Sequence, residues 1–357
     1  ALAEEIDTPG EGQVRALVTV AGNPVLSTPN GARLDAALDQ LDFMVAVDIY
    51  VNETTRHADV ILPVPSALQK PHYDVALLQF ALRNVANWSE PVLPLAPDQP
   101  DEWEVLAKLA AIASGLGPDA EPAVIDDVVF GAASQSSPAE LVAAVEATDR
   151  RGPARLVDHM LRIGPYDLTL DDLLANPHGV DLGALEPRLP EVLRTPSGQI
   201  EMAPELILGD VARLAGALVE PEAQGDREFT LIGRRHLRSN NSWMHNVQVL
   251  VKGRPRCTVL VHPDDAARIG LAEGDPAVVT SRVGSVTAPV ELNDGIRPGV
   301  ISLPHGWGHG VDGTRLRVAA EHAGVNSNVL TDELDIDPLS GNAVLNGIPV
   351  SLAPAPG

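Results

Sequence analysis

Length, composition and charge exclude several classes of protein. The chain has 357 residues, enough for about two domains of roughly 150 residues each. It carries 25 Lys and Arg against 49 Asp and Glu, a net charge of −24, so neither nucleic acid nor an anionic membrane surface is an expected partner. No apolar run is long enough to cross a bilayer, and no membrane insertion is expected. Cys257 is the single cysteine, which excludes internal disulfides and an iron–sulfur cluster or cysteine-built zinc site on this chain.

The first residues, Ala1-Leu2-Ala3, include neither an initiating Met nor an apolar signal-like segment. We interpret them as a processed or truncated start. This start does not encode the compartment. The cytoplasm is the default expectation and the periplasm is the alternative.

The first part of the chain, residues 1–150, alternates apolar strands with helices. Buried strands are predicted at residues 14–20, 43–47 and 59–63, and helices at residues 32–41 and 101–112. Continuous apolar strands alternating with helices indicate a parallel sheet. Because only three such strands are visible, we interpret this part as a portion of a doubly wound α/β domain.

The middle of the chain is rich in Pro, Ala and Asp and is more irregular. Ser137-Pro138-Ala139-Glu140 predicts a capping box that opens a helix over residues 141–146. Residues 211–228 are interpreted as a linker. We therefore expect residues 151–226 to form a helical and irregular connector.

From Phe229 onward the sequence predicts short strands separated by closely spaced turns. These strands are expected at residues 229–232, 258–261, 276–281, 285–292 and 300–303. A short helix is predicted over residues 262–270, with Pro263 near its start and Gly270 at its end. This pattern indicates a compact β-barrel over residues 227–357.

A stretch without acidic residues is the most informative pattern. No Asp or Glu lies between Glu228 and Asp264, although six of the chain's 25 cationic residues do: Arg234, Arg235, Arg238, Lys252, Arg254 and Arg256. Guanidinium groups suit phosphate, and Gly233 permits close approach of backbone N–H groups. The stretch predicts an anion site; the alternative is a solvated basic strand edge.

The segment Ser239-Asn240-Asn241-Ser242-Trp243-Met244-His245-Asn246 is dense in amide and hydroxyl groups. Such groups can read the edge of a purine or pterin by hydrogen bonds, and Trp243 can stack on its face. The alternative is a polar loop with one buried Trp.

Two further features lie outside that segment. Asp48 and Glu53 follow the second predicted strand, at the end where open sheets bind ligands. The loop Pro304-His305-Gly306-Trp307-Gly308-His309 is interpreted as ligand-facing, since no third ligand supports a metal site there. The G-x-G-x-x-G match at residues 308–313 lies outside any βαβ unit and is interpreted as chance.

Several motifs, in this order, form a recognisable combination. They are Gly22-Asn23-Pro24, Val47-Asp48-Ile49-Tyr50, Glu53-Thr54-Thr55, Ala58-Asp59-Val60-Ile61-Leu62-Pro63, Asp101-Glu102-Trp103, Thr195-Pro196-Ser197-Gly198, Gly233-Arg234-Arg235, His262-Pro263-Asp264-Asp265-Ala266 and Asp337-Pro338-Leu339-Ser340-Gly341. With them the chain resembles the C-terminal half of molybdopterin oxidoreductases of the dimethyl sulfoxide reductase family, which includes formate dehydrogenases and nitrate reductases.

The resemblance implies a fold and a cofactor. It implies the second part of a Rossmann-like α/β domain, followed by a double-psi-type β-barrel that binds a molybdopterin dinucleotide. The implied cofactor is bis-molybdopterin guanine dinucleotide with Mo or W. The residues implied to bind it are Gly22, Asn23, Pro24, Asp48, Thr54, Gly233, Arg234, Arg235, Asn240, Ser242, Trp243, His245, Asn246, His305 and Asn328. The resemblance implies that Gly22, Asn23, Asp48 and Thr54 approach a guanosine portion of the cofactor. It implies that His305 and Asn328 approach the pterin side.

The chain also departs from the family. Neither the family's cysteine motif nor the segment that supplies the protein ligand to molybdenum is present. A 4Fe-4S cluster is therefore expected only on a missing N-terminal part, and this chain alone is expected to be inactive, with no catalytic residue or metal ligand of its own. Gln69-Lys70-Pro71-His72-Tyr73-Asp74 replaces a Gly-Thr and Glu-Gly-Arg stretch of many members.

Two functions follow as hypotheses. The first is the cofactor-binding part of a molybdenum-dependent oxidoreductase, partnered by the missing N-terminal half or subunit and by an iron–sulfur electron-transfer protein. The alternative is a non-catalytic structural or cofactor-binding subunit of a redox complex that keeps the fold. If the first is right, charge reversal at Arg234 is expected to lower cofactor retention.

Overall fold

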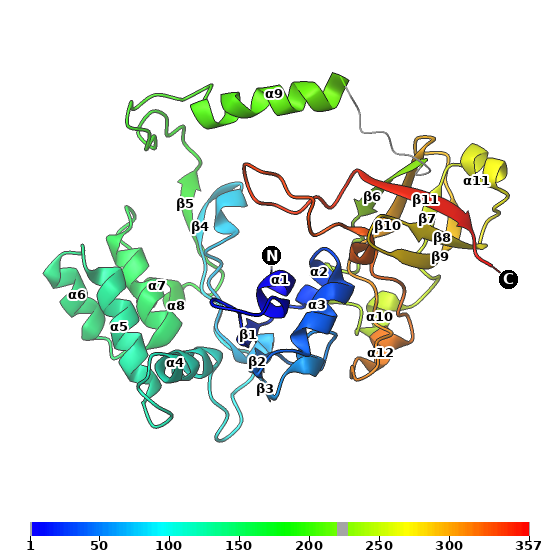
Figure 1. Cartoon of the computed structure of the whole chain (residues 1–357). Coiled ribbons are helices and arrows are strands. Elements are labelled where there is room, and N and C mark those ends of the chain that lie inside the picture. The colour runs from blue at the N-terminus through cyan, green and yellow to red at the C-terminus, as the bar shows by residue number, and fades with distance from the viewer. Residues whose placement is uncertain (1, 220–227, 357) are drawn as a thin grey trace. The chain divides into compact units, whose positions relative to one another are not determined.

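The computed structural model describes residues 2–219 and 228–356, and the chain divides into two compact units (Figure 1). The first unit consists of Ala1–Pro63 and Glu201–Gly357, and the second of Val64–Ile200. These ranges differ from the three expected from the sequence. The boundary expected at residue 150 falls inside the second unit, because the helices on either side of it pack against each other.

A three-stranded parallel sheet forms the N-terminal part of the first unit. Its strands, in spatial order, are β1 (Ala16–Val20), β2 (Phe43–Val47) and β3 (Val60–Leu62). The helices α1 (Leu2–Asp7) and α3 (Gly31–Leu38) pack beside it, with a shared core of Ile6, Leu34, Leu38 and Met44. The three strands, their parallel pairing and the helix after β1 are confirmed, but burial is confirmed only for β2 among these three: β1 alternates exposed and half-buried residues, and β3 begins with an exposed Val60.

A closed six-stranded barrel forms the C-terminal part of the first unit (Figure 1). Its strands, in order around the barrel, are β10 (Val300–Pro304), β6 (Phe229–Arg234), β11 (Ile348–Pro354), β8 (Pro276–Thr280), β9 (Ser285–Leu292) and β7 (Val259–Val261). The pairs β10–β6 and β7–β9 are parallel, and the remaining pairs are antiparallel. Alternate residues point inward and bury an apolar core, as Phe229, Ile301 and Leu303 illustrate. The predicted β-barrel is confirmed.

Short helices connect these layers. They are α2 (Pro24–Ser27), η1 (Thr55–His57), α10 (Gln248–Val251), α11 (Pro263–Ile269), α12 (Arg317–Ala320) and η4 (Ser327–Leu330). The predicted helix with Pro263 at its start is α11, and Gly270 ends it in the left-handed conformation, with φ of 77°.

The prediction of a linker over residues 211–228 is wrong up to Val219. A 15-residue helix, α9 (Glu205–Val219), occupies that part. The remainder of the predicted linker and connector, residues 220–227, lies outside the described residues. Two glycines in α9, Gly209 and Gly216, lower its helix propensity, so the sequence pattern there resembles that of a linker.

The second unit is mainly helical. Its elements are η2 (Ala67–Gln69), η3 (Leu78–Phe80), β4 (Arg83–Ala86), α4 (Glu102–Ala113), α5 (Pro122–Ser134), α6 (Ala139–Glu146), α7 (Gly152–Ile163), α8 (Leu170–Ala175) and β5 (Val180–Ala184). The predicted helices at residues 101–112 and 141–146 are confirmed as α4 and α6. The predicted capping box at Ser137 does not form, because Pro138 takes the N-cap position and the Ser137 hydroxyl lies 2.9 Å from His159 Nε2.

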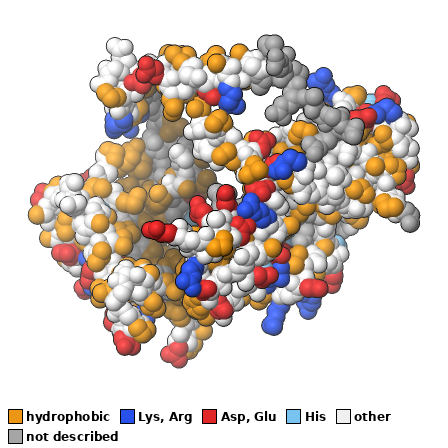
Figure 2. All heavy atoms as spheres, viewed as in Figure 1, with side chains coloured by type: hydrophobic (Ala, Val, Ile, Leu, Met, Phe, Trp, Pro, Cys, Tyr) orange, Lys and Arg blue, Asp and Glu red, His pale blue; other side chains and the backbone are white. Residues whose placement is uncertain are grey.

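Hydrophobic side chains gather on the surface of the second unit (Figure 2). Phe80 and Leu82 are 75% and 93% exposed. Large apolar patches on a protein surface mark places where another polypeptide or ligand binds. No helix among the described residues is long and apolar enough to span a membrane.

Candidate functional site

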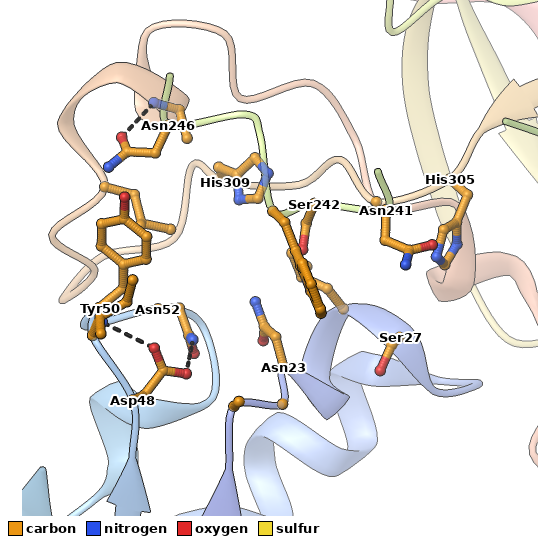
Figure 3. A pocket seen from close by; sticks show the side chains of 18 of the residues that line it. Asn23, Ser27, Asp48, Tyr50, Asn52, Asn241, Ser242, Asn246, His305 and His309 are labelled. Atoms are coloured by element: carbon orange, nitrogen blue, oxygen red, sulfur yellow. Dashed lines mark hydrogen bonds between the residues drawn. The ribbon is translucent and has the colours of Figure 1, made fainter. Parts of the chain in front are cut away.

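A pocket of about 730 Å³ opens in the first unit where the parallel sheet meets the barrel (Figure 3). The sheet contributes the turns after β1 and β2, and the barrel contributes the segments after β6 and β10. Because the carboxyl ends of neighbouring parallel strands lie at one edge of a sheet, Asn23 and Asp48 face the same space. The volume is that of a typical small-molecule site.

On the sheet side, Asp48 is held by its own turn. Its carboxylate accepts hydrogen bonds from the backbone N–H of Tyr50 at 2.9 Å and from the Asn52 side chain at 3.2 Å (Figure 3). Both contacts fix the direction of the carboxylate, which remains on the pocket wall. A carboxylate fixed in this way can accept from two adjacent N–H donors of a ligand.

On the barrel side, the segment after β6 supplies most of the polar lining. Asn246 Oδ1 accepts from the backbone N–H groups of Val318 and Ala319, which fixes the amide at the start of α12. Ser242 and Asn241 also line the pocket, Asn241 beside His305, and Arg235 bonds to Asn241 (Figure 3). Trp243 is 69% exposed, so the alternative of a polar loop with one buried Trp is wrong. An exposed indole face on a pocket wall is suited to stacking on a flat ring.

A chain of three buried titratable groups runs from the pocket wall, at His309, to Glu53 and His245 behind it. His309 Nδ1 is 3.1 Å from Glu53 Oε1, and His309 Nε2 is 2.8 Å from His245 Nδ1. All three side chains are at most 2% exposed, and the His245 ring stacks on Trp307 with centroids 3.9 Å apart. The sheet side of this chain is fixed by Asn23, whose amide donates to Glu53 Oε2 at 2.8 Å.

The environment shifts the pKa values of these groups in opposite senses. Burial by itself would raise the pKa of Glu53, but the hydrogen bonds from His309 and Asn23 outweigh it and hold that pKa below its usual value. Burial, with a smaller contribution from His309, lowers the pKa of His245 to about 3. Glu53 is therefore a carboxylate and His245 a neutral imidazole at neutral pH.

The pocket brings together many of the residues named from the sequence. Those that line it are Gly22, Asn23, Asp48, Arg235, Ser242, Trp243, Asn246 and His305. The residues of that set that do not line it are Pro24, Thr54, Gly233, Arg234, Asn240, His245 and Asn328. Further lining residues were not among the individual residues predicted to bind the cofactor: Ser27, Tyr50, Asn52, Asn241 and His309. Of these, Asn241 and His309 lie in segments that the sequence predicted to face a ligand.

Arg234 departs most from its expected role. Its guanidinium donates to the backbone carbonyls of Ser302 at 2.7 Å and Thr258 at 2.8 Å, and to the Thr258 hydroxyl at 2.7 Å. Burial lowers its pKa, and the nearby carboxylate of Glu291 opposes that shift. Arg234 ties β6 to β7 and β10, and within residues 228–356 Arg235 is the cation of the acid-free stretch that lines the pocket.

Other predicted residues support the pocket from behind. The Thr54 hydroxyl donates to Asn23 Oδ1 at 2.7 Å and accepts from the backbone N–H of Val25 at 3.1 Å. The Asn328 amide donates to the carbonyl of Leu26 at 2.7 Å, which ties η4 of the barrel to α2. Thr54 thus fixes the turn after β1 within the sheet layer, and Asn328 ties the barrel layer to it.

Gly306 sets the distance between two of the pocket's segments. Its φ is +91°, and a Cβ there would lie 2.3 Å from the backbone oxygen of Asn241. We expect Gly306→Ala to displace the Asn241–Ser242 backbone and to reduce ligand retention by about tenfold or more. Gly299 is the matched control, because its φ is +79° and a Cβ there meets nothing within 4 Å. Ligand retention by both variants of the full-length protein, measured by nucleotide analysis, checks this; equal retention would contradict it.

Among residues 2–219 and 228–356, no group of three or more His, Cys, Asp or Glu side chains is placed to hold a metal ion. His309 belongs to the chain with Glu53 and His245. The groups that line the pocket are of kinds that can contact a flat polar ring and an anionic group.

Comparisons with known proteins agree with this geometry. Residues 1–111 match the family described as molybdopterin oxidoreductase, and residues 229–349 match the molydopterin dinucleotide binding domain. The F420-dependent formate dehydrogenase subunit alpha of Methanocaldococcus jannaschii is 25% identical over 308 residues, which cover 85% of this chain and 40% of that protein. The assimilatory nitrate reductase catalytic subunit of Bacillus subtilis is 29% identical over 111 residues, which cover 30% of this chain and 14% of that protein.

A solved structure shares the fold. The acetylene hydratase from Pelobacter acetylenicus superposes with a TM-score of 0.70 at 19% sequence identity, covering 99% of this chain and 46% of that one. The chain thus spans less than half the length of each of these relatives.

Proposed function

Because this chain belongs to the molybdopterin oxidoreductases, we propose that it is the cofactor-binding part of a molybdenum- or tungsten-dependent enzyme. The observation that carries the proposal is the pocket between the sheet and the barrel, which lies where the two matched family regions meet. The implied group is bis-molybdopterin guanine dinucleotide. When bound, that cofactor supplies two-electron redox chemistry at its metal, and this chain's residues bind and orient it.

The donor set of the pocket fits the guanine dinucleotide portion. The fixed Asp48 carboxylate can accept from the two adjacent N–H donors on one edge of guanine, and the exposed face of Trp243 can stack on the ring. Arg235 can pair with a diphosphate as a guanidinium fork. The predicted residues that line the pocket are proposed to contact the cofactor directly, and those behind it to position these contacts.

The finer fold assignments belong to the same proposal. We assign the three parallel strands to a Rossmann-like domain that other strands complete, and the barrel to the double-psi type. The mixture of two parallel and several antiparallel strand pairs around the closed barrel supports the second assignment.

The complete enzyme is proposed to resemble formate dehydrogenase or nitrate reductase. Another part of it would carry the 4Fe-4S cluster and the protein ligand to the metal, because Cys257 is the single cysteine here. An iron–sulfur protein is the proposed electron partner, in keeping with relatives that are named as subunits. The exposed apolar surface of the second unit offers an area for contact with the missing part.

The test uses the full-length protein and measures GMP released by acid hydrolysis together with Mo and W content. Asp48→Asn and Trp243→Ala are each expected to lower GMP content by about tenfold or more, because a hydrogen bond to a charged group or a stacked ring is lost. Asp294→Asn, an exposed carboxyl in a barrel turn, is the control and should retain wild-type GMP.

Two outcomes would count against the proposal. Undiminished GMP in both pocket variants would remove the pocket from cofactor binding. A folded wild-type protein without GMP or metal would support the non-catalytic subunit instead, an alternative that the reductase and dehydrogenase relatives do not favour.

A further inference from the structure

The Glu53–His309–His245 chain joins both layers of the pocket by two consecutive contacts. Glu53 follows β2, His309 follows β10, and His245 precedes α10. His309 lines the pocket, whereas Glu53 and His245 lie behind it. His245 Nε2 is buried and makes no hydrogen bond within the described residues. A buried nitrogen without a partner is costly, so its presence calls for a functional explanation.

Counting protons along this chain gives two states. Glu53 is ionised and can only accept a hydrogen bond, so the proton between Glu53 and His309 is bonded to His309 Nδ1. In the first state both imidazoles are neutral: His245 Nδ1–H donates to His309 Nε2, and His245 Nε2 is a bare acceptor. In the second state one proton has been added at His245 Nε2, and the Nδ1 proton has moved to His309 Nε2. His309 is then an imidazolium paired with Glu53, and His245 is again neutral.

The geometry favours holding that added proton on His309. His309 lies against the Glu53 carboxylate, whereas His245 stacks on Trp307 and has no acidic contact. A buried cation is stabilised when a carboxylate pairs with it. The chain can thus take up one proton without leaving a charge unpaired.

The pocket lacks cations for an anionic ligand. Among its lining residues in the described part of the chain, Arg235 is the one permanent cation and Asp48 the one carboxylate. His305 adds little, because burial and Arg235 lower its pKa. The charged and titratable groups around the His309–His245 pair are therefore Glu53, Asp48, Arg235, His305 and, on the His245 side, His236. A diphosphate bearing two negative charges exceeds what Arg235 alone can neutralise.

We propose that binding of the anionic cofactor is coupled to uptake of one proton by the Glu53–His309–His245 chain, which makes His309 a second cation of the pocket. The inference rests on the proposed function, because it takes the ligand to be a guanosine diphosphate ester. The proton comes from hydronium or the acid form of the buffer, whose bond to that proton breaks, and it enters at His245 Nε2; within the protein only N–H bonds form and break. His309 and Glu53 are positioning and charge-compensating residues in this scheme.

The experiment is calorimetric titration of the full-length protein, prepared without cofactor, with diguanosine pyrophosphate. This probe is a diester and has no phosphate group that titrates near neutral pH. Titration in buffers of different ionisation enthalpy gives the number of protons bound with the ligand. The wild type is expected to take up close to one proton per chain. Guanosine, which lacks the charge, is expected to bind with almost no proton uptake.

Variants locate the proton. Glu53→Gln and His309→Gln are expected to abolish the uptake and to weaken binding of the diester more than binding of guanosine, because only the diester needs the added cation. His178→Gln removes an exposed histidine of the second unit and should leave the uptake at the wild-type value.

The outcomes separate this inference from the function beneath it. Binding of the diester by the wild type with no proton uptake would overturn the inference and leave the proposed function standing. Failure of both the diester and guanosine to bind would overturn both. Because the wild-type measurement decides the first question, the inference does not depend on whether a buried variant folds.

Discussion

Lowering the pH from 6.5 to 5 is expected to reduce the free energy of unfolding by about 2 kcal/mol through His245 alone. The ring is buried against Trp307, and burial lowers its pKa to about 3, whereas an unfolded chain titrates it with a pKa of 6.5. Below pH 6.5 the unfolded chain binds a proton that the folded chain excludes. Stability is therefore complete above pH 6.5 and falls by about 1.4 kcal/mol per pH unit until the folded pKa is reached.

The measurement is urea unfolding of the full-length protein over a series of pH values, compared with His245→Gln. The variant lacks the titrating ring, so its slope below pH 6.5 should be smaller by about 1.4 kcal/mol per pH unit. His236 and His305, whose pKa values are also lowered, contribute to both proteins and cancel in the comparison. Identical slopes would show that His245 is not a buried neutral imidazole.

Replacing Asp126 by alanine is expected to destabilise the second unit by about 3–5 kcal/mol. Asp126 is 4% exposed; its carboxylate accepts from Arg155 at 3.0 Å and from the backbone N–H of Gly152 at 2.9 Å. Arg155 is itself buried, with its guanidinium 3.9 Å from the centre of the Phe130 ring. Removal of the carboxylate leaves the buried Gly152 N–H without this acceptor and leaves Arg155 with the exposed Asp127 as its close carboxylate, and both penalties add.

The matched control is the neighbouring carboxyl, Asp127, which also pairs with Arg155 but is exposed. Hydrogen bonds from Arg155 and Arg151 lower its pKa, yet solvent screens the interaction, so Asp127→Asn should change stability much less. Thermal unfolding of both variants is the measurement. Equal effects would mean that burial of Asp126 does not set the strength of its ion pair. The pocket of the first unit should keep its ligand in both, because neither residue lies in that unit.

Local sequence patterns determined the parts of the fold that depend on periodicity. The apolar run of β2 reflects burial on both faces of a sheet, and the alternation along β9 reflects burial on one face. The strands β1 and β3 were predicted from apolar residues that stay half-buried or exposed. Helix α7 was not predicted, since its buried face contains Arg155, Asp158 and His159 in place of apolar residues. Polar residues that pair with one another in a core do not produce an apolar stripe.

The sequence by itself also determined where a ligand site should lie. The position of Asp48 after a buried strand, and the amides and hydroxyls around Trp243, required only local composition and the rule that sheets bind ligands at the ends of their strands. The resemblance of the ordered motifs to a family then named the cofactor, and the family matches over residues 1–111 and 229–349 confirm the resemblance.

Only the tertiary structure decided which side chains face the pocket and which are used elsewhere. Arg234 and Arg235 are equivalent in sequence, but adjacent residues of an extended chain point in different directions, and closure of the barrel places the carbonyls of Ser302 and Thr258 around Arg234. The contact between Glu53 and His309 joins residues 256 positions apart. Such a contact depends on how two layers pack and on which groups lose solvent together, and neither property is contained in a local stretch of sequence.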